Sequence, residues 1–554
     1  MDLTFYFKIL ALVTFLSWLF HIFRRLSLWL YFWQLKEYRF DRFLDGIKEN
    51  KFLLFPRVVI WSLVLLLALI FSLSFEIPHY IFIFLSLLLY VILGLRSLYF
   101  FVRKEWNLPK FTSKTIVLFF FSGGGTLFFG FRNSLYFFQS VLSPFNYFLY
   151  LFLFEIFFPV FISLLIVLFQ IPTFFIKKMI IKNAKAKMKK FKRLLVVGVT
   201  GSYGKTSTKE FLYKLLSQKY KTYKTPANQN SEIGVAKAVL EDLKEDHQIF
   251  ICEMGAYRKG EIKAICDIVH PKIGILTGIS GQHISLFGNL RNIINTKYEL
   301  ISSLPKDGLA IFNSTNEECQ KLAQRTTIKK FIYFVSSAPQ SEPRDQKPDV
   351  WAQDINETSD FIEFLMKTFK GDERIRLNLL GRYNIENFLG AITCALYLGV
   401  SLNTIKKIAP DIKPSETSLR KKGGKNNVTI IDDSYSQNPD GTFSAIDYLK
   451  TYKNGKKIVL MPCLIELGKS APAIHKSIGR MIGKNFDLAI ITTPFYFEEI
   501  KIGAMESKML KDKILFSNNP GEISKELRPY LSPGNVILIE GRVPNKIKDF
   551  IGIH

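Results

Sequence analysis

The chain has 554 residues, of which 48% are hydrophobic and 15% aromatic, and it carries a formal net charge of +27. This apolar content excludes a largely disordered chain, because disorder requires low hydrophobicity together with high net charge. At about 100 to 200 residues per domain, the length predicts several domains rather than one.

The composition divides the chain into two unlike parts. Residues 1–176 are rich in Phe, Leu and Trp, whereas the remainder is an ordinary mixture of charged and apolar residues. All cysteines lie in the second part, widely spaced and without a CxxC pair: Cys252, Cys266, Cys319, Cys394 and Cys463. This pattern predicts a reducing compartment and no disulfide or zinc framework. We therefore expect a membrane module over 1–176, followed by a soluble part.

Five segments are long and apolar enough for a membrane-spanning helix, which needs about 20 apolar residues. They are 2–23, 58–75, 80–102, 115–137 and 146–171. The first segment alternatively resembles a cleaved signal peptide, but it contains Asp2, lacks a small-residue cleavage site and ends at two arginines, so we favour an uncleaved anchor. Residues 26–35 are too short to cross and rich in Trp and Tyr, which favours an interfacial segment.

The Lys and Arg residues of the short loops predict the orientation. They gather in 24–57, in 103–114 and in 177–193, where the last run has no acidic residue. This places the N-terminus outside and the soluble part in the cytoplasm, in a multi-pass protein of the cell's inner (cytoplasmic) membrane. The basic juxtamembrane linker 177–193 suits membrane lipids as partners better than nucleic acid, and we expect no nucleic-acid partner.

Ionisable residues inside spans are rare and often functional. Arg96 and Gln170 lie close enough to span ends for their side chains to reach the membrane surface. Glu155 is more central, so it either lines a polar pocket or pairs with a group on another span.

From residue 194 onward, short β-branched runs alternate with helical stretches, which is typical of α/β domains with a parallel sheet. The first set of predicted strands is 194–199, 249–255 and 272–279, and a later set is 428–434, 456–462, 487–493 and 535–541. The polar, Gly-containing segment 414–427 separates the two sets. We therefore expect one α/β domain over 194–413 and a second over 414–554.

The strongest chemical signal is LLVVGVTGSYGKTST, in which an apolar strand leads through a Gly-rich loop into a helix. Gly201 and Gly204 allow backbone N–H groups to surround a phosphate, Lys205 supplies positive charge, and the Thr206 hydroxyl is suited to Mg²⁺. The strict Walker pattern has Gly where this chain has Val199. The strand, loop and helix together predict a nucleotide-binding site.

The loop Gly201-Ser202-Tyr203-Gly204-Lys205-Thr206-Ser207 resembles the phosphate loop of the Mur ligase family, with all seven positions expected around the nucleotide. Further blocks resemble this family in the same order: TPANQNSEIGVA (225–236), EMGAYRKGEI (253–262), GQHISLFGN (281–289), NTKYEL (295–300), GRYNIENFLGA (381–391), DDSYSQNPDG (432–441) and ELGKSAPAIHKSIG (466–479). They are most similar to the MurF type, which adds D-alanyl-D-alanine to the UDP-muramoyl tripeptide. The resemblance covers roughly 193–554 and implies a P-loop central domain and a Rossmann-like C-terminal domain.

A ligase of this kind must activate a carboxylate with ATP and neutralise negative charge, which is suited to Mg²⁺ and Lys. Glu253, at the end of a buried strand, is placed to ligate Mg²⁺, and His283, after the next strand, to hold a second ion. A helix-capping carboxylate and a hydrogen-bonding loop histidine are the alternatives. The resemblance implies that Lys297 is carbamylated by CO₂ and orients Mg²⁺, whereas by itself it would be a solvated helix lysine.

The resemblance implies nucleotide-binding roles for four further residues. Asn384 and Asn387 resemble the family's adenine-binding asparagines, although Tyr383 stands where His is more usual. Arg420 and Asp433 resemble groups of the C-terminal domain that reach the γ-phosphate and the ribose on domain closure. A surface arginine and a strand-end aspartate are the alternatives for these two residues.

Two departures from the family affect the expected substrates. Pro462-Cys463-Leu464 replaces the usual Gly-Asp-Met, and Ser436-Gln437 replaces Asn-Ala, in the domain that selects the incoming amine. The membrane module takes the place of the family's soluble UDP-sugar-binding domain. We expect an ATP- and Mg²⁺-dependent amide ligase that acts on a cell-wall precursor peptide, UDP-linked or lipid-linked, with an amino acid or a D-alanyl-D-alanine-like amine. The alternatives are a ligase for another polymer, such as poly-γ-glutamate, and an ATP-driven transporter.

Overall fold

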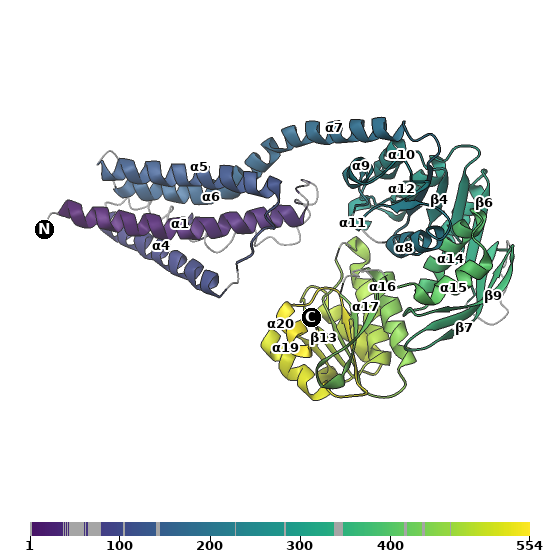
Figure 1. The fold of residues 1–554 in the computed structure, drawn as a ribbon. Helices are drawn as coiled ribbons and strands as arrows, with labels where there is room; N and C mark the ends of the chain where they lie inside the picture. The colour runs from purple at the N-terminus through teal and green to yellow at the C-terminus, as the bar shows by residue number, and fades with distance from the viewer. Residues whose placement is uncertain are drawn as a thin grey trace. The chain divides into compact units, whose positions relative to one another are not determined.

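The computed structural model describes residues 3–36, 38, 40, 43, 60, 63–64, 79–103, 106–139, 144–227, 229–281, 284–336, 347–414, 418–434, 438–465 and 467–553. The chain forms two compact units, which meet in sequence between Lys177 and Lys178. The first is the helical unit and the second, with two sheets, is the α/β unit (Figure 1).

The helical unit packs long apolar helices around an aromatic core. The helices are α1 (Leu3–Leu35), α4 (His79–Val102), α5 (Ser113–Phe138), α6 (Pro144–Leu168) and the start of α7 (Gln170–Met188). Helix α1 contacts α4, α5 and α6, and the fully buried side chains at its centre include Trp18, Trp33 and Tyr90. Since most of the outward side chains are also apolar, the unit is suited to a lipid environment.

Among the described residues, three helical stretches are long and apolar enough to cross a membrane: Phe84–Val102, Ser113–Phe138 and Asn146–Met188. They contain or overlap the predicted spans 80–102, 115–137 and 146–171. The predicted span 2–23 lies within α1, and most of 58–75 lies outside the described residues. Membrane insertion of the unit therefore stays a prediction.

Helix α1 continues without a break through Arg24 and Arg25 and includes the predicted interfacial segment 26–35. The two arginines suggested a span boundary because charged residues are costly in an apolar bundle. Arg25 is buried, however, and forms an ion pair with Glu155 of α6. Of the two alternatives for Glu155, the structure thus has it paired with another helix.

The first sheet of the α/β unit has the strand order β2-β3-β1-β4-β5-β6-β7-β8-β9. Its strands are β1 (Leu195–Thr200), β2 (Thr222–Lys224), β3 (Ile249–Glu253), β4 (Ile273–Leu276), β5 (Leu309–Asn313), β6 (Lys330–Val335), β7 (Val350–Glu357), β8 (Ile362–Thr368) and β9 (Gly371–Leu377). From β2 to β7 the neighbours are parallel, as predicted. The sheet then continues into an antiparallel meander through β8 and β9, which the sequence analysis did not predict.

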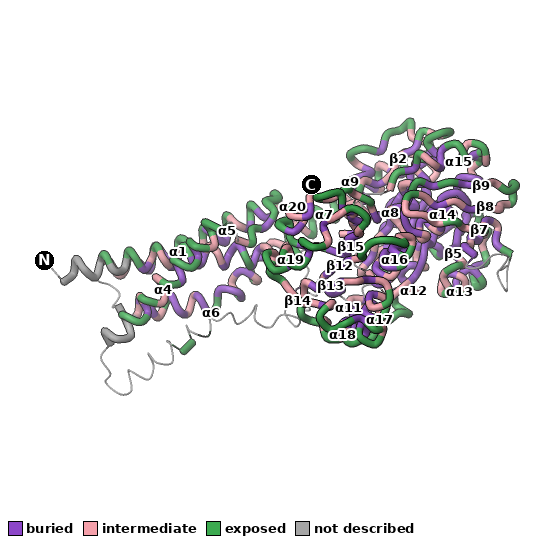
Figure 2. The backbone as a smooth tube through the Cα atoms, turned by 90° about the horizontal axis from the view of Figure 1, so that it is seen from below, coloured by how far each residue is buried: buried purple, intermediate pink, exposed green. Residues whose placement is uncertain are grey.

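Helices cover this sheet and bury its strands (Figure 2). They are α8 (Lys205–Leu216), α9 (Glu232–Glu241), α10 (Glu261–Val269), α11 (Ile284–Phe287), α12 (Leu290–Ser302), α13 (Glu317–Arg325), α14 (Tyr383–Tyr397) and α15 (Leu402–Ile408). Capping residues in the sequence determine where two of these helices begin. The Ser231 hydroxyl caps α9 by accepting from the Gly234 N–H at 3.3 Å, and the Asn289 side chain caps α12 by accepting from the Asn292 N–H at 2.8 Å. Strands β1 and β3 are buried on both faces, which explains their continuous apolar runs.

The second sheet has the order β10-β11-β15-β12-β13-β14, parallel except for the edge pair β10 and β11. Its strands are β10 (Arg420–Gly423), β11 (Thr429–Asp433), β12 (Lys457–Met461), β13 (Leu488–Ile491), β14 (Ile514–Phe516) and β15 (Val536–Glu540). Its helices are α16 (Pro439–Tyr448), α17 (Ala471–Asn485), α18 (Phe497–Glu506), α19 (Pro520–Leu527) and α20 (Asn545–Ile551). The four strands predicted after residue 427 are β11, β12, β13 and β15.

Candidate active site

The phosphate loop lies at the carboxyl edge of the first sheet. Strand β1 is central, between β3 and β4, so its end meets the ends of both neighbours. Gly204 has φ +76°, a left-handed conformation that favours glycine, and it leads directly into α8. The Lys205 ammonium donates to the carbonyl oxygens of Gly201 at 2.9 Å and Ser202 at 3.1 Å. This lysine therefore lies folded over the loop, at the positive N-terminal end of a helix.

The other loop residues anchor the loop to its surroundings. The Ser202 N–H donates to the Gly278 carbonyl at 2.8 Å, and the Tyr203 hydroxyl accepts from the Asn316 amide at 3.3 Å. Ser207 is buried, with its hydroxyl 3.4 Å from that of Ser418. These contacts anchor the loop to Gly278, Asn316 and Ser418.

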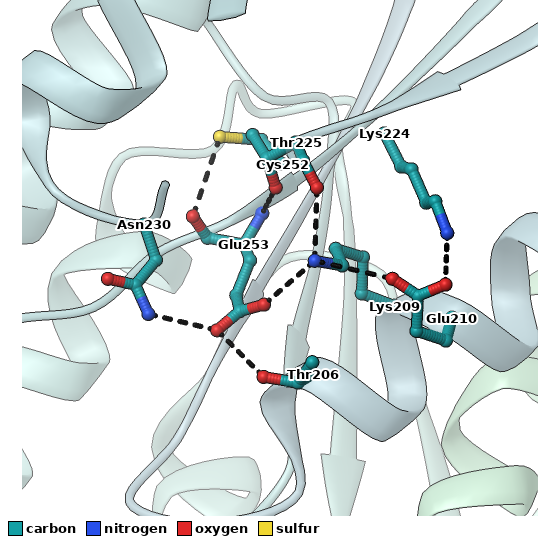
Figure 3. Close-up of polar contacts among 8 residues, drawn as sticks. All are labelled: Thr206, Lys209, Glu210, Lys224, Thr225, Asn230, Cys252 and Glu253. Carbon is teal, nitrogen blue, oxygen red and sulfur yellow. Dashed lines mark hydrogen bonds and ion pairs between the residues drawn. The ribbon is translucent and has the colours of Figure 1, made fainter. Parts of the chain in front are cut away.

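Glu253 is the centre of a buried hydrogen-bond network (Figure 3). Its Oε1 accepts from the Thr206 hydroxyl at 3.1 Å and from the Asn230 amide at 3.0 Å. Its Oε2 lies 3.1 Å from the Nζ of Lys209, which also donates to the Thr225 carbonyl at 3.0 Å. The predicted metal ligands Thr206 and Glu253 are thus adjacent, and a buried lysine holds the second carboxylate oxygen.

The charges around Glu253 determine its protonation. Burial alone would raise the pKa of Glu253, but the nearby Lys209 and Lys205 ammonium groups and the Asn230 hydrogen bond outweigh burial and lower that pKa below its usual value. Burial lowers the pKa of Lys205, and the Glu253 carboxylate partly opposes this shift. The site therefore holds an ionised carboxylate beside two lysines at neutral pH.

Lys297 lies on α12, with only 4% of its surface exposed. Burial, with a smaller contribution from the Lys205 charge, lowers the pKa of Lys297 to about 7. Its amine is therefore substantially neutral at physiological pH, unlike the solvated helix lysine that the sequence alone suggested. His283 lies outside the described residues, so the structure does not place this predicted ligand.

The predicted adenine-binding residues lie on α14, which packs against α8. Asn387 is buried next to Gly204, where any added Cβ would meet its Oδ1 atom. Asn384 is also buried, and its amide donates to the Leu380 carbonyl at 2.7 Å. The Tyr383 hydroxyl accepts from the Leu419 N–H at 3.3 Å, immediately before the second sheet. Helix α14 therefore contacts both the phosphate loop and the chain that enters the second sheet.

Arg420 and Asp433 belong to the second sheet. Arg420 begins β10 and pairs in register with Asp432, next to Asp433 at the end of β11. Asp433 is buried beside Glu540 of β15, its register partner. Burial raises the pKa of Asp433 above its usual value, although a hydrogen bond from Glu540 opposes the shift. Two neighbouring buried carboxyl groups of this kind share a proton at neutral pH.

Several residues around this site were not identified from the sequence. Lys209 lies one turn after Lys205 on α8, and Asn230 and Thr225 lie in the TPANQNSEIGVA block. The sequence does not show that they contact Glu253, because Glu253 lies on a strand far from them in sequence. Glu540 lies near the end of the predicted strand 535–541 and is the last residue of β15, and this position was the available signal for a strand-end carboxylate.

Oxygen ligands are what Mg²⁺ prefers in proteins. Among the described residues, no group of three or more His, Cys, Asp and Glu side chains is placed to hold a metal ion. The Thr206 hydroxyl and the ionised Glu253 carboxylate nevertheless fit a Mg²⁺ ion that takes its remaining ligands from phosphate and water, as this ion does in nucleotide sites.

The fold and the loop define a P-loop nucleotide-binding protein with two α/β sheets. Family models for the Mur ligase middle domain and for the Mur ligase glutamate ligase domain match residues 199–395 and 419–543. The chain belongs to the Mur ligase family.

Several curated relatives share the name UDP-N-acetylmuramoyl-tripeptide–D-alanyl-D-alanine ligase. The one from Borreliella burgdorferi is 33% identical over 377 residues, which are 66% of this chain and 74% of the relative. Those from Synechocystis and Escherichia coli are 30% and 31% identical over 52% and 51% of this chain. The chain spans only 59% and 61% of the length of these last two relatives.

Solved structures agree with the family assignment. MurF from Acinetobacter baumannii superposes with a TM-score of 0.58 at 26% identity, over 66% of this chain and 77% of that one. MurF from Thermotoga maritima, solved in complex with ADP, gives a TM-score of 0.56 at 25% identity, over 68% of this chain and 83% of that one.

Proposed function

We propose that this protein is a membrane-anchored, ATP- and Mg²⁺-dependent amide ligase of peptidoglycan precursor synthesis. Its substrates are a muramoyl-peptide carboxylate and an amine such as D-alanyl-D-alanine, as the names of its relatives suggest. The observation that carries this proposal is the cluster of the half-buried Lys205 and Thr206 with the buried Glu253 at the ends of β1 and β3.

In the proposed reaction, a carboxylate oxygen attacks the γ-phosphorus of ATP, and ADP leaves. The amine nitrogen then attacks the acyl carbon, inorganic phosphate leaves, and the nitrogen loses a proton to give the amide. Lys205 and the N–H groups at the start of α8 stabilise the transferring phosphate. Thr206 and Glu253 hold Mg²⁺, which neutralises phosphate charge when it is bound.

The remaining predicted site residues complete this proposal. Lys297, as a carbamate, would orient Mg²⁺, and His283 would hold a second ion. Asn384 and Asn387 lie on the helix that contacts the phosphate loop, where they bind the adenine. Arg420 and Asp433 contact the γ-phosphate and the ribose from the second sheet.

The membrane part of the proposal follows from the helical unit. Three helical stretches of sufficient length and apolarity, together with the basic run 177–193, support insertion in the cytoplasmic membrane with the α/β unit on the cytoplasmic side. A donor carried on a membrane lipid would then lie within reach of the ligase.

Product analysis tests the proposed reaction. Full-length protein in neutral detergent is incubated with ATP, Mg²⁺, UDP-muramoyl tripeptide or its lipid-linked counterpart, and D-alanyl-D-alanine. We expect ADP, inorganic phosphate and a product whose mass equals the sum of both substrates minus water. Lys205→Ala, folded as judged by its melting temperature, should lower turnover by orders of magnitude because it removes charge from the transferring phosphate. Ligation at the wild-type rate in this variant would reject the site assignment.

A further inference from the structure

A group of charged side chains from two helices of the helical unit includes the buried His21 and Arg25, the half-buried Arg24 and the exposed Arg96. His21, Arg24 and Arg25 follow one another on α1 within about one helical turn. Arg25 forms an ion pair with Glu155 of α6 and also donates to the Glu155 carbonyl at 3.1 Å. The His21 Nε2 lies 3.7 Å from Glu155 Oε1, too far for a hydrogen bond.

Arg24 extends toward α4 instead. Its guanidinium carbon lies 4.1 Å from the centre of the Phe100 ring, and that of Arg96, also on α4, lies 5.8 Å from the same ring. Two cations from different helices thus converge on one aromatic ring. His21 is within electrostatic reach of Arg24, Arg25 and Arg96.

The charges of this group do not balance. Glu155 is the only carboxylate among the described residues of the helical unit, and it pairs with Arg25. No described carboxylate pairs with Arg24 or Arg96. Arg24 is half-buried and Arg96 exposed on an apolar helix surface, and two like charges side by side there repel each other unless an anion compensates them. The group therefore carries an excess positive charge.

Several buried polar atoms of the same helices also have no hydrogen-bond partner. They are Arg25 Nη2, both ring nitrogens of His21, the Tyr90 and Ser86 hydroxyls, the Trp18 indole nitrogen and one acceptor, Glu155 Oε1. The side chains of all six residues are more than nine-tenths buried. Most of these atoms are donors, and an unpaired buried donor is destabilising. A ligand with several acceptor oxygens would satisfy both the donors and the excess charge.

We propose that His21, Arg24, Arg25, Tyr90 and Arg96 form a binding site for the phosphate end of a polyprenyl-phosphate-type lipid. This inference rests on the proposed function, because it identifies how a lipid-linked donor is held. In the predicted topology, α1 and α4 both run toward the cytoplasmic side, and Arg96 lies about 9 Å from the end of α4 at Val102. Both ends face the cytoplasm, where the ligase would meet the peptide of such a lipid.

Equilibrium binding of a labelled polyprenyl diphosphate to the full chain in neutral detergent tests this site. Unlabelled polyprenyl diphosphate, polyprenol, phosphatidylglycerol and inorganic diphosphate serve as competitors. We expect polyprenyl diphosphate to compete at concentrations at least about tenfold lower than each of the others, because only it combines the phosphates with the polyprenyl chain. Equal competition by polyprenol or by phosphatidylglycerol would overturn the proposal.

Variants assign the binding to these residues. Arg24→Gln with Arg96→Gln should weaken binding about tenfold or more, since it removes the uncompensated charges and leaves the Arg25–Glu155 pair intact. Arg132→Gln is the matched control, because Arg132 is an exposed arginine of α5 beside an aromatic ring, Tyr136. Unchanged binding by the double variant, with an unchanged melting temperature, would contradict the site. Ligation of the UDP-linked donor, measured on the same preparations, reports separately on the proposed function.

Discussion

At the residue scale, we expect that, among the residues around Glu253, replacement of Lys209 lowers the free energy of unfolding most. Lys209→Met leaves an ionised carboxylate buried without its cation, and breaking a buried pair from one side costs about 3–5 kcal/mol. We expect a loss of this order in the free energy of unfolding of the α/β unit, measured by denaturant titration. ATP turnover should fall as well, because Glu253 is no longer held toward Thr206.

Two further variants test whether the lost charge of Lys209, and not its lost side-chain packing, causes the loss of stability. Lys209→Arg keeps the cation, and Lys209→Met combined with Glu253→Gln removes both charges, so each should regain part of the lost stability. The double variant should stay inactive. Since the folded pKa of Glu253 is lowered, the pair stabilises the protein above the unfolded pKa of about 4.3, and this contribution is lost as pH falls through the lower folded value. A double variant less stable than Lys209→Met would contradict the ion-pair account.

Lys297 permits a different prediction, because carbamate formation requires a neutral amine and the pKa of Lys297 is lowered to about 7. Removing CO₂ and bicarbonate from the buffer should lower ligation reversibly. Lys297→Ala should be nearly inactive, and short carboxylates should restore part of its activity by replacing the carbamate. Carbon-13 NMR with labelled bicarbonate should show a carbamate signal that the variant lacks. Full activity of Lys297→Ala would end this hypothesis.

Stability offers a second readout for Lys297. Its folded pKa is lowered, so between about pH 7 and pH 10.4 the unfolded chain binds more protons than the folded one. The stability of the wild type relative to Lys297→Met should therefore increase as pH rises through this window. A flat difference would indicate that the lysine is solvated.

Some residues of the site could be predicted from the sequence and others could not. Lys205, Thr206 and Glu253 follow from a local pattern, since a phosphate loop and a strand end place them at the same sheet edge. Lys209 and Asn230 did not, because their role depends on pairing with Glu253, which lies 44 and 23 residues away in sequence. A lysine on a helix is usually solvated, so only the tertiary structure reveals that Lys209 is fully buried.

At the element scale, the phosphate loop and α14 are fitted to each other at Gly204. Gly204→Ala introduces a left-handed alanine, which costs roughly 1–2 kcal/mol, and its Cβ also meets the Asn387 side chain. We expect a loss of stability and a much weaker affinity for ATP, measured by calorimetry or nucleotide-dependent thermal shift.

Gly260 provides a matched control for that substitution. It has φ +91° at the start of α10, with open space where a Cβ would lie. Gly260→Ala should therefore cost a similar amount in backbone conformation and leave ATP affinity unchanged. If both variants bound ATP equally well, the contact between Gly204 and Asn387 would have no part in nucleotide binding.

Elements were predictable where the apolar pattern was strong and local. The strands β1, β3, β4, β11, β12, β13 and β15 follow from continuous buried runs. The meander β7 to β9 alternates buried and exposed residues on a polar edge, so its pattern is weak. The sequence predicted a boundary at Arg24 and Arg25, whereas α1 continues to Leu35. The prediction missed this because the partner of Arg25 is Glu155 of α6, 130 residues later.

At the scale of the whole molecule, the first expectation concerns topology. Five spans with the observed Lys and Arg bias place the N-terminus outside and the C-terminal end inside. Tags at the two ends of the chain should be accessible to an impermeant label from opposite sides of the membrane. If both tags were labelled from one side, the number of spans would be even, and the five-span prediction would be wrong.

A further prediction at this scale concerns how the helical unit and the α/β unit act together as one enzyme. Embedding the helical unit in the bilayer confines the α/β unit to the membrane surface, where the effective concentration of a lipid-linked donor reaches the millimolar range or so for a short tether. We therefore expect the full chain in vesicles to turn over a lipid-linked muramyl peptide faster than the UDP-linked form. A fragment over 178–554, which keeps its own hydrophobic cores, should lose this preference while retaining ligation of the UDP-linked donor. Initial rates of the full chain and of the fragment on both donors measure the effect. If full chain and fragment favoured the UDP-linked donor equally, the helical unit would contribute nothing to donor selection, and its role would be reduced to localisation.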